Sequence, residues 1–123
     1  MSTAIMKNKA IHLRLGFALN GILFALKSEA SFRTQLLAAM AIAIVLIVTR
    51  PSPVWWGIII LTTGAVLAAE LFNTALEKTL DHLHPAQHPQ IKLAKDAAAG
   101  AVLVLGLTAI LVFISFLASV FPG

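Results

Sequence analysis

The carboxyl-terminal segment, residues 97–123, carries no ionisable side chain and is rich in valine, leucine, isoleucine and phenylalanine. A run of this length is long enough for one α-helix to cross the roughly 30 Å hydrocarbon core of a bilayer. Two more uncharged apolar segments precede it, at residues 34–49 and 51–69. Only 11% of the chain is charged, whereas an ordinary soluble domain carries about 25% charged residues. The sequence therefore predicts a single all-α domain, residues 1–123, integral to a membrane, and excludes an ordinary water-soluble enzyme.

The uncharged segments predict three transmembrane helices, at about residues 31–50, 54–82 and 91–121. The first run lies between Arg33 and Arg50 and has 16 residues, which cover about 24 Å at the helical rise of 1.5 Å per residue. This helix must therefore extend into its flanking residues or lie in a thinned bilayer. A proline-rich turn at residues 51–53 joins the first two helices, and the two tryptophans at 55–56 suit a membrane–water interface.

A basic amphipathic stretch at residues 5–28 precedes the first predicted membrane helix. Such a stretch is typical of a helix that lies along the membrane surface. A cleavable signal peptide, with a basic start and an apolar middle, is the alternative. Asn20 and Gly21 interrupt the apolar run, and Lys27 and Glu29 lie where cleavage would occur. These residues favour a surface helix.

The basic residues are distributed unevenly between the two sides of the predicted membrane. Of nine, five precede the first membrane helix, three flank the second connection, and only Arg50 lies in the first connection. The positive-inside rule places the side with eight basic residues in the cytoplasm. The loop at residues 82–89 is therefore expected to be cytoplasmic, with the second helix extending toward it, and the C-terminus is expected outside. The net charge of +4 is explained by this topology and by anionic lipid, so no nucleic-acid partner is expected.

Polar side chains recur along one face of the second predicted membrane helix. They follow at spacings of four, three and four, with an asparagine beside them: Glu70, Thr74, Glu77 and Asp81, and Asn73. A carboxylate in a membrane helix is costly unless a partner or a water-filled cavity receives it, so a functional role is the default interpretation. Clustered carboxylates suit a hard cation such as Mg²⁺, and one of them could act as a general base. The alternative is a solvated helix end in which the acids pair with Lys78.

Charged residues also lie near the same end of the other two predicted membrane helices. Glu29 and Arg33 stand just before the first helix, and Lys95 and Asp96 open the third. We therefore expect four acids and one lysine to converge in a crevice bordering the lipid: Glu29, Glu70, Glu77, Asp96 and Lys95. Such a set would supply metal ligands, a cation for phosphate and a base, the groups that phosphoryl transfer requires.

Several other chemistries lack the residues they need. The chain has no cysteine, which excludes thiolate metal sites, iron–sulfur clusters and a cysteine nucleophile. Its glycines are too scattered for a phosphate-binding loop, so any nucleotide must be held by side chains and metal. Three histidines, His82, His84 and His88, share one proline-containing loop. They are interpreted as solvated or close to a nucleotide rather than as a transition-metal site.

Three segments together resemble the signature of a known family. Residues 70–77 read Glu-Leu-Phe-Asn-Thr-Ala-Leu-Glu, and residues 94–103 read Ala-Lys-Asp-Ala-Ala-Ala-Gly-Ala-Val-Leu. With the stretch at residues 20–33, they are similar to the prokaryotic diacylglycerol kinases, small membrane kinases unrelated to the soluble kinases. The resemblance covers about residues 14–121, which is nearly the whole chain.

The resemblance implies a homotrimer in the bacterial inner membrane, with three membrane helices and a surface helix per protomer and a cytoplasmic active site. It also implies that ATP and Mg²⁺ are used to phosphorylate the hydroxyl of sn-1,2-diacylglycerol, giving phosphatidic acid. By position, Glu70 would be the base, and Glu29 and Glu77 would hold Mg²⁺ on the nucleotide phosphates. By position, the site would be completed by Asn73, Lys95 and Asp96. Two further residues would lie near the nucleotide, Phe17 and His88.

Two positions depart from the enterobacterial branch of the family. Ala10 stands where that branch has an arginine near the nucleotide, and Lys9 or Arg14 are the candidates to replace it. Ala99 stands where that branch has a serine near the lipid. The run at residues 95–100 resembles instead a broader branch that includes undecaprenol kinases, so undecaprenol is the alternative acceptor. The chain could instead be a non-catalytic membrane protein, a channel or a regulatory subunit, whose acidic side chains would bind ions or a partner. A channel would need these side chains around a pore.

Overall fold

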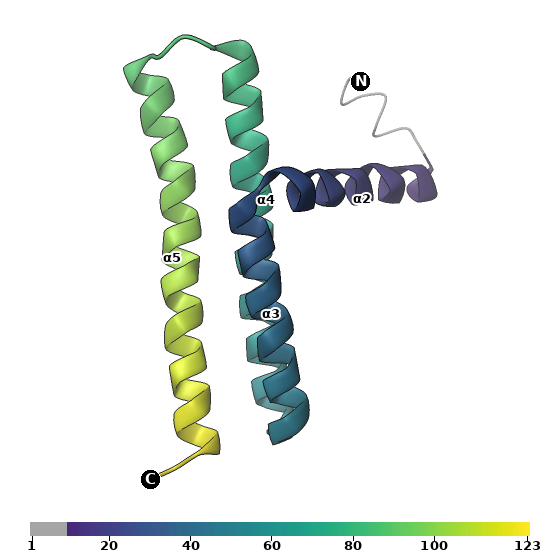
Figure 1. Ribbon diagram of the computed structural model, residues 1–123, viewed down its shortest axis with the longest axis vertical. Helices are drawn as coiled ribbons and strands as arrows, with labels where there is room; N and C mark the ends of the chain where they lie inside the picture. Colours follow the sequence, from purple (N-terminus) through teal and green to yellow (C-terminus); the bar gives the residue numbers. More distant parts are fainter. Residues whose placement is uncertain (1–9) are drawn as a thin grey trace.

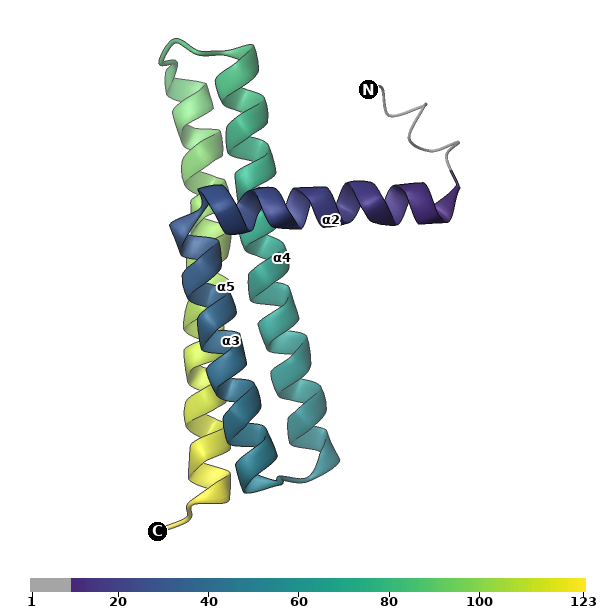
Figure 2. The same ribbon diagram turned by 45° about the vertical axis from the view of Figure 1, so that its right-hand side comes forward.

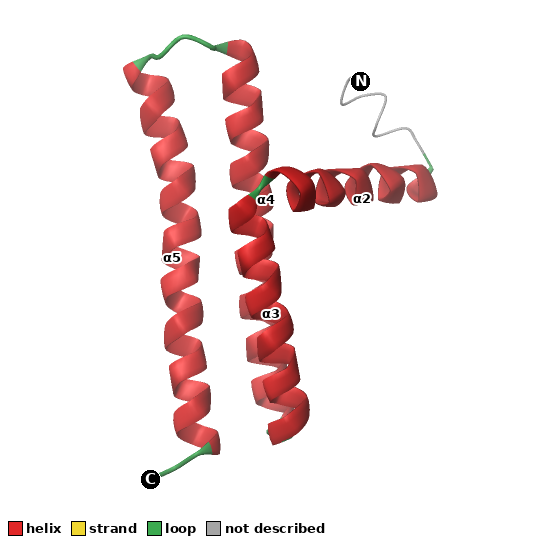
Figure 3. Cartoon of the chain, viewed as in Figure 1, coloured by secondary structure: helices red, strands yellow, loops and turns green. Residues whose placement is uncertain are grey.

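A computed structural model describes residues 10–123, which form four α-helices and short connections without a β-strand. The helices are α2 (Ile11–Ser28), α3 (Ala30–Thr49), α4 (Pro53–Leu83) and α5 (Pro89–Val120). The helices α3, α4 and α5 run side by side as a bundle, and α2 lies crosswise to them (Figures 1 and 2). Almost the whole described chain is helical (Figure 3). The all-helical prediction is therefore confirmed for these residues.

The three bundle helices are long and apolar enough to cross a membrane. Their limits lie within two residues of the predicted ones. Large apolar side chains cover their outer surface, with Leu61, Val48 and Leu111 among the most exposed. A soluble protein rarely exposes so much contiguous apolar surface. The chain is therefore a multi-pass membrane protein.

The helix α2 accounts for most of the stretch expected to form a surface helix. It begins at Ile11, and residues 5–9 of the predicted helix lie outside the described residues. One residue, Glu29, has an extended backbone and separates α2 from α3. The crosswise orientation of α2 is visible in Figure 2. Its position along a membrane surface stays a prediction.

A side chain from α3 fixes the elbow between α2 and α3. The last carbonyls of an α-helix have no partner within the helix. Arg33 Nη1 donates hydrogen bonds to two such carbonyls of α2, those of Leu26 at 2.9 Å and Lys27 at 3.0 Å. Because one guanidinium joins both helices, the position of Glu29 at the elbow is defined by the start of α3.

The buried apolar core lies near the end of the bundle that carries the α3–α4 turn. It consists of Leu46, Ile59 and Phe116, one residue from each membrane helix. The indole of Trp55 packs edge-on against Phe116, with ring centroids 5.6 Å apart, and its Nε1 donates to Ser119 Oγ at 3.2 Å. This end of the bundle is thus held by apolar packing, which leaves the polar residues for the other half.

The two connections and the C-terminus allow a test of the predicted topology. The α3–α4 turn and the C-terminus lie at one end of the bundle, and the α4–α5 loop lies at the other (Figure 2). The natural chain has no cysteine, so single cysteines can be introduced as Ser52→Cys, Ala86→Cys and Pro122→Cys. The lysine and arginine distribution predicts that an impermeant thiol reagent labels positions 52 and 122 in intact cells, and position 86 only after permeabilisation. The reverse pattern would contradict this orientation.

Candidate active site

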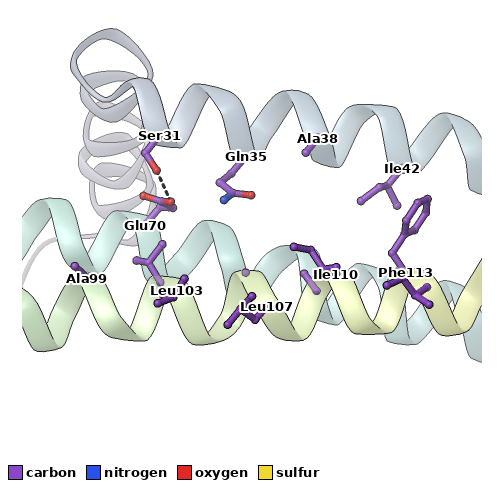
Figure 4. Close-up of a pocket in the computed structure, with 14 residues that line it drawn as sticks. Ser31, Gln35, Ala38, Ile42, Glu70, Ala99, Leu103, Leu107, Ile110 and Phe113 are labelled. Carbon is purple, nitrogen blue, oxygen red and sulfur yellow. Dashed lines mark hydrogen bonds between the residues drawn. The ribbon is translucent and has the colours of Figure 1, made fainter.

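Glu70 is the buried carboxylate of the described chain. It lies in α4 level with the elbow and is 3% exposed. Its Oε1 accepts a hydrogen bond of 2.6 Å from Ser31 Oγ, at the start of α3 (Figure 4). Thr74, one turn further along α4, is also buried and donates to the main-chain carbonyl of Glu70 at 3.0 Å. The carboxylate is thus held where α3 and α4 meet.

An apolar groove of about 550 Å³ begins at this carboxylate. It follows α3 and α5 toward the apolar core, and side chains from both helices point into it (Figure 4). Glu70, Ser31 and Gln35 are the polar side chains of its lining, and Ala99 of α5 lies near the same end. The remaining lining is apolar and includes Ile42, Leu103, Leu107, Ile110 and Phe113. The groove suits a molecule with a long apolar chain and a polar head beside Glu70.

A second polar pair lies one to two turns along α4 from Glu70. Asn73 Nδ2 donates to Glu77 Oε1 at 3.1 Å. The Oδ1 atom of Asn73 is buried and has no hydrogen-bond partner among the described residues. A buried acceptor without a partner is costly, and carboxylate and amide oxygens are ligands of Mg²⁺. These two residues therefore fit a divalent cation.

The expected convergence of four acids and Lys95 is not found within one chain. Lys95 Nζ is paired with Asp81, and Lys92 Nζ is paired with Asp96 at 2.7 Å. No three acidic or histidine side chains in residues 10–123 lie close enough together to hold a metal ion. One reason is distance along the helix, because Glu70 and Glu77 share a face of α4 but stand about 10 Å apart.

The alternative interpretation, in which the acids pair with Lys78, is also not what the structure contains. Lys78 Nζ lies 5.5 Å from the ring centroid of Phe24 in α2, a cation–π distance. The acids of α4 instead contact Ser31, Asn73 and Lys95. Lys78 therefore joins α4 to α2.

The α4–α5 connection encloses a second hollow, of about 510 Å³. Its lining includes Asp81, His84, His88, Lys92 and Lys95. The His88 Nδ1 accepts from the main-chain N–H of Gln90 at 3.1 Å and so caps the start of α5. Lys92 and Lys95 are the cationic side chains of this hollow, and each is paired with an aspartate, Asp96 and Asp81 respectively.

The structure separates the remaining predicted site residues. Phe17 is half-buried on α2 and lines neither hollow, and Glu29 lies at the elbow. Ala10 precedes α2 and Arg14 is exposed on it, whereas Lys9 lies outside the described residues. That Lys9 or Arg14 takes the place of an arginine at position 10 stays a prediction.

Sequence reasoning missed two polar residues of the groove, Ser31 and Gln35. Their spacing of four places them on one face of α3, which is a signal the sequence did contain. The sequence carries no signal for the partner of Ser31, because that contact depends on how α3 lies against α4.

These features define a small helical membrane protein with a buried carboxylate at the head of an apolar groove. The chain belongs to the prokaryotic diacylglycerol kinase family, whose model matches residues 16–117. This is a family of lipid kinases, which are transferases.

The relatives of the chain are named for two acceptor lipids. An undecaprenol kinase from Bacillus subtilis is 42% identical over 84 residues, which are 68% of each chain. A diacylglycerol kinase from Pseudomonas aeruginosa is 34% identical over 89 residues, or 72% of each chain. One from Synechocystis is 31% identical over 109 residues, which are 88% of this chain and 61% of that protein.

Proposed function

We propose that the chain is an ATP-dependent lipid kinase that phosphorylates the hydroxyl of sn-1,2-diacylglycerol to give phosphatidic acid. Undecaprenol is the alternative acceptor. The observation that carries this proposal is the buried Glu70 carboxylate at the head of the apolar groove. A lipid whose acyl or prenyl chain lies in the groove brings its hydroxyl to this carboxylate.

In this proposal Glu70 acts as the general base. Its carboxylate accepts the proton of the acceptor hydroxyl while the hydroxyl oxygen bonds to the γ-phosphorus of ATP. The bond between that phosphorus and the bridging oxygen breaks, and ADP leaves. The apolar lining of the groove excludes water from the base and so favours transfer to lipid over hydrolysis.

Mg²⁺ is proposed to be held by Glu29 and Glu77, with Asn73 beside them. When bound, it neutralises charge on the nucleotide phosphates. The buried Oδ1 of Asn73 and its contact with Glu77 support this assignment. Glu29 lies on another element of the chain, and the described residues hold no cluster of three such ligands. From the family resemblance we also propose a homotrimer in which neighbouring protomers complete the site.

The nucleotide is proposed to bind near the α4–α5 loop. This end of the protein is proposed to face the cytoplasm, with the helices in the inner membrane of a bacterium. Lys95 and His88 line the hollow there, and Asp96 and Phe17 are assigned by family position. Two lysines in the hollow, Lys92 and Lys95, support binding of polyphosphate.

The acceptor is tested by competition between diacylglycerol and undecaprenol in one mixed-micelle preparation with labelled ATP. Ala99 offers a methyl group near Glu70, where a serine could donate a hydrogen bond to glycerol or ester oxygen. A site without that donor discriminates poorly between lipids that differ in polar groups. We expect both lipids to be phosphorylated, with kcat/KM values within about two orders of magnitude of each other.

The matched variant is Ala99→Ser, which adds only the hydroxyl. It is expected to shift the ratio toward diacylglycerol by at most about 1 kcal/mol, or about fivefold. Strict use of one lipid, unchanged in the variant, would show that the acceptor is chosen elsewhere. Phosphorylation of neither lipid by the assembled protein would contradict the proposed function.

A further inference from the structure

We propose that Ser31 is a positioning residue that holds the Glu70 carboxylate in the orientation required for proton transfer. This inference rests on the proposed function, in which Glu70 is the base. The contact that carries it is the 2.6 Å hydrogen bond from Ser31 Oγ to Glu70 Oε1, between α3 and α4 (Figure 4). A hydroxyl–carboxylate bond of this length belongs to the stronger class of hydrogen bonds.

Glu70 needs such a partner because its side chain has several rotatable bonds and lies against an apolar groove. Among residues 10–123, Ser31 supplies the hydrogen bond to its carboxylate. Thr74 is near, but it donates to the main-chain carbonyl of Glu70 and leaves the carboxylate free to rotate. Ser31 therefore determines which way the carboxylate faces.

The contact leaves the base able to act. An ionised carboxylate has two oxygens and about four acceptor positions, and Ser31 uses one of them on Oε1. Oε2 remains for the acceptor hydroxyl. If Ser31 instead occupied the place of that hydroxyl, its removal would lower the acceptor KM, which is the opposite of what positioning predicts.

The backbone that carries Ser31 is itself fixed. Ser31 lies in the first turn of α3, two residues after Glu29 and two before Arg33. Arg33 bonds the end of α2 and so fixes the elbow. The hydrogen bond to Glu70 therefore sets the base on α4 in register with the segment that carries Glu29, the proposed metal ligand.

The test compares Ser31→Ala, which removes the hydroxyl, with Ser31→Thr, which keeps it. We expect kcat to fall about tenfold in Ser31→Ala, since a hydrogen bond to a charged group is lost, while the acceptor KM stays within about threefold. Ser31→Thr is expected to recover most of the turnover. The control is Ser28→Ala, because Ser28 Oγ donates to Phe24 O within α2 and does not contact Glu70; it is expected to match the wild type.

A second comparison places Ser31→Ala in the Glu70→Gln background, where it is expected to cause no further loss. Should Ser31→Ala fail to assemble, Ser31→Cys preserves the volume with a weaker donor, and its kcat is expected to lie between those of alanine and threonine. Unchanged kcat, or a lowered acceptor KM, in Ser31→Ala or Ser31→Cys overturns the inference. An inactive Glu70→Gln with a fully active Ser31→Ala overturns only this inference, whereas full activity of Glu70→Gln overturns the proposed base.

Discussion

Glu70→Gln is expected to keep the fold and bind nucleotide but to lose about 10² to 10⁴ in turnover, the usual cost of removing a general base. Glutamine has the size of glutamate, and its amide oxygen still accepts the hydrogen bond that Ser31 donates to Glu70 Oε1. The amide cannot take a proton at neutral pH. The loss is therefore expected in kcat with little change in assembly.

The measurement is kcat at saturating ATP and lipid, with nucleotide binding followed separately by titration. Thr62→Val is the control, since it also removes a polar group from α4, but one that donates to the main-chain carbonyl of Ile58 and lines neither hollow. Its turnover is expected to stay within a few-fold of wild type. Wild-type kcat in assembled Glu70→Gln would refute the assignment of the base.

Glu29→Ala and Glu77→Ala are each expected to raise the Mg²⁺ concentration needed for half-maximal activity by about tenfold or more. Each removes an oxygen ligand from a cation that binds through carboxylates and phosphates, and loss of even an indirect ligand contact costs about 10- to 100-fold in metal affinity. Because both residues are assigned to one site, their effects are expected to be non-additive.

The measurement is a Mg²⁺ titration of activity at fixed ATP, together with direct Mn²⁺ binding to the assembled protein. Asn73→Ala is an informative companion, because Asn73 donates to Glu77 Oε1 and its loss frees that carboxylate without removing it. The Mg²⁺ concentration needed for half-maximal activity is expected to rise less in Asn73→Ala than in the two glutamate variants. If Mg²⁺ dependence changes in only one of the two glutamate variants, the other glutamate has a structural role.

The membrane helices could be predicted from sequence because their cause is local. An uncharged run such as residues 97–123 is long enough to cross a bilayer. In the hydrocarbon core, a helix satisfies the hydrogen bonds of its backbone N–H and C=O groups within the segment itself. Helical periodicity also placed Glu70 and Thr74 on one face, and both are buried in the structure. Composition and periodicity act within one segment, so they need no knowledge of the neighbouring helices.

The contacts between helices could not be predicted in the same way. Periodicity gives the direction of a side chain around its own helix but not its height against another helix. The sequence therefore predicted that Lys95 would join the glutamates, whereas the structure pairs it with Asp81. The bond from Ser31 to Glu70 was missed for the same reason, since it depends on the register of α3 against α4.

The groove between α3 and α5 has a kinetic consequence for the proposed reaction. It lies along helices that are apolar enough to stand within the membrane, so the acceptor reaches Glu70 by sideways diffusion in two dimensions. The concentration that governs the encounter is then the mole fraction of acceptor among the lipids. At a constant total amount of acceptor, dilution with inert lipid is expected to slow the reaction. Addition of water is expected to leave the rate unchanged, because it does not alter the mole fraction of acceptor in the membrane.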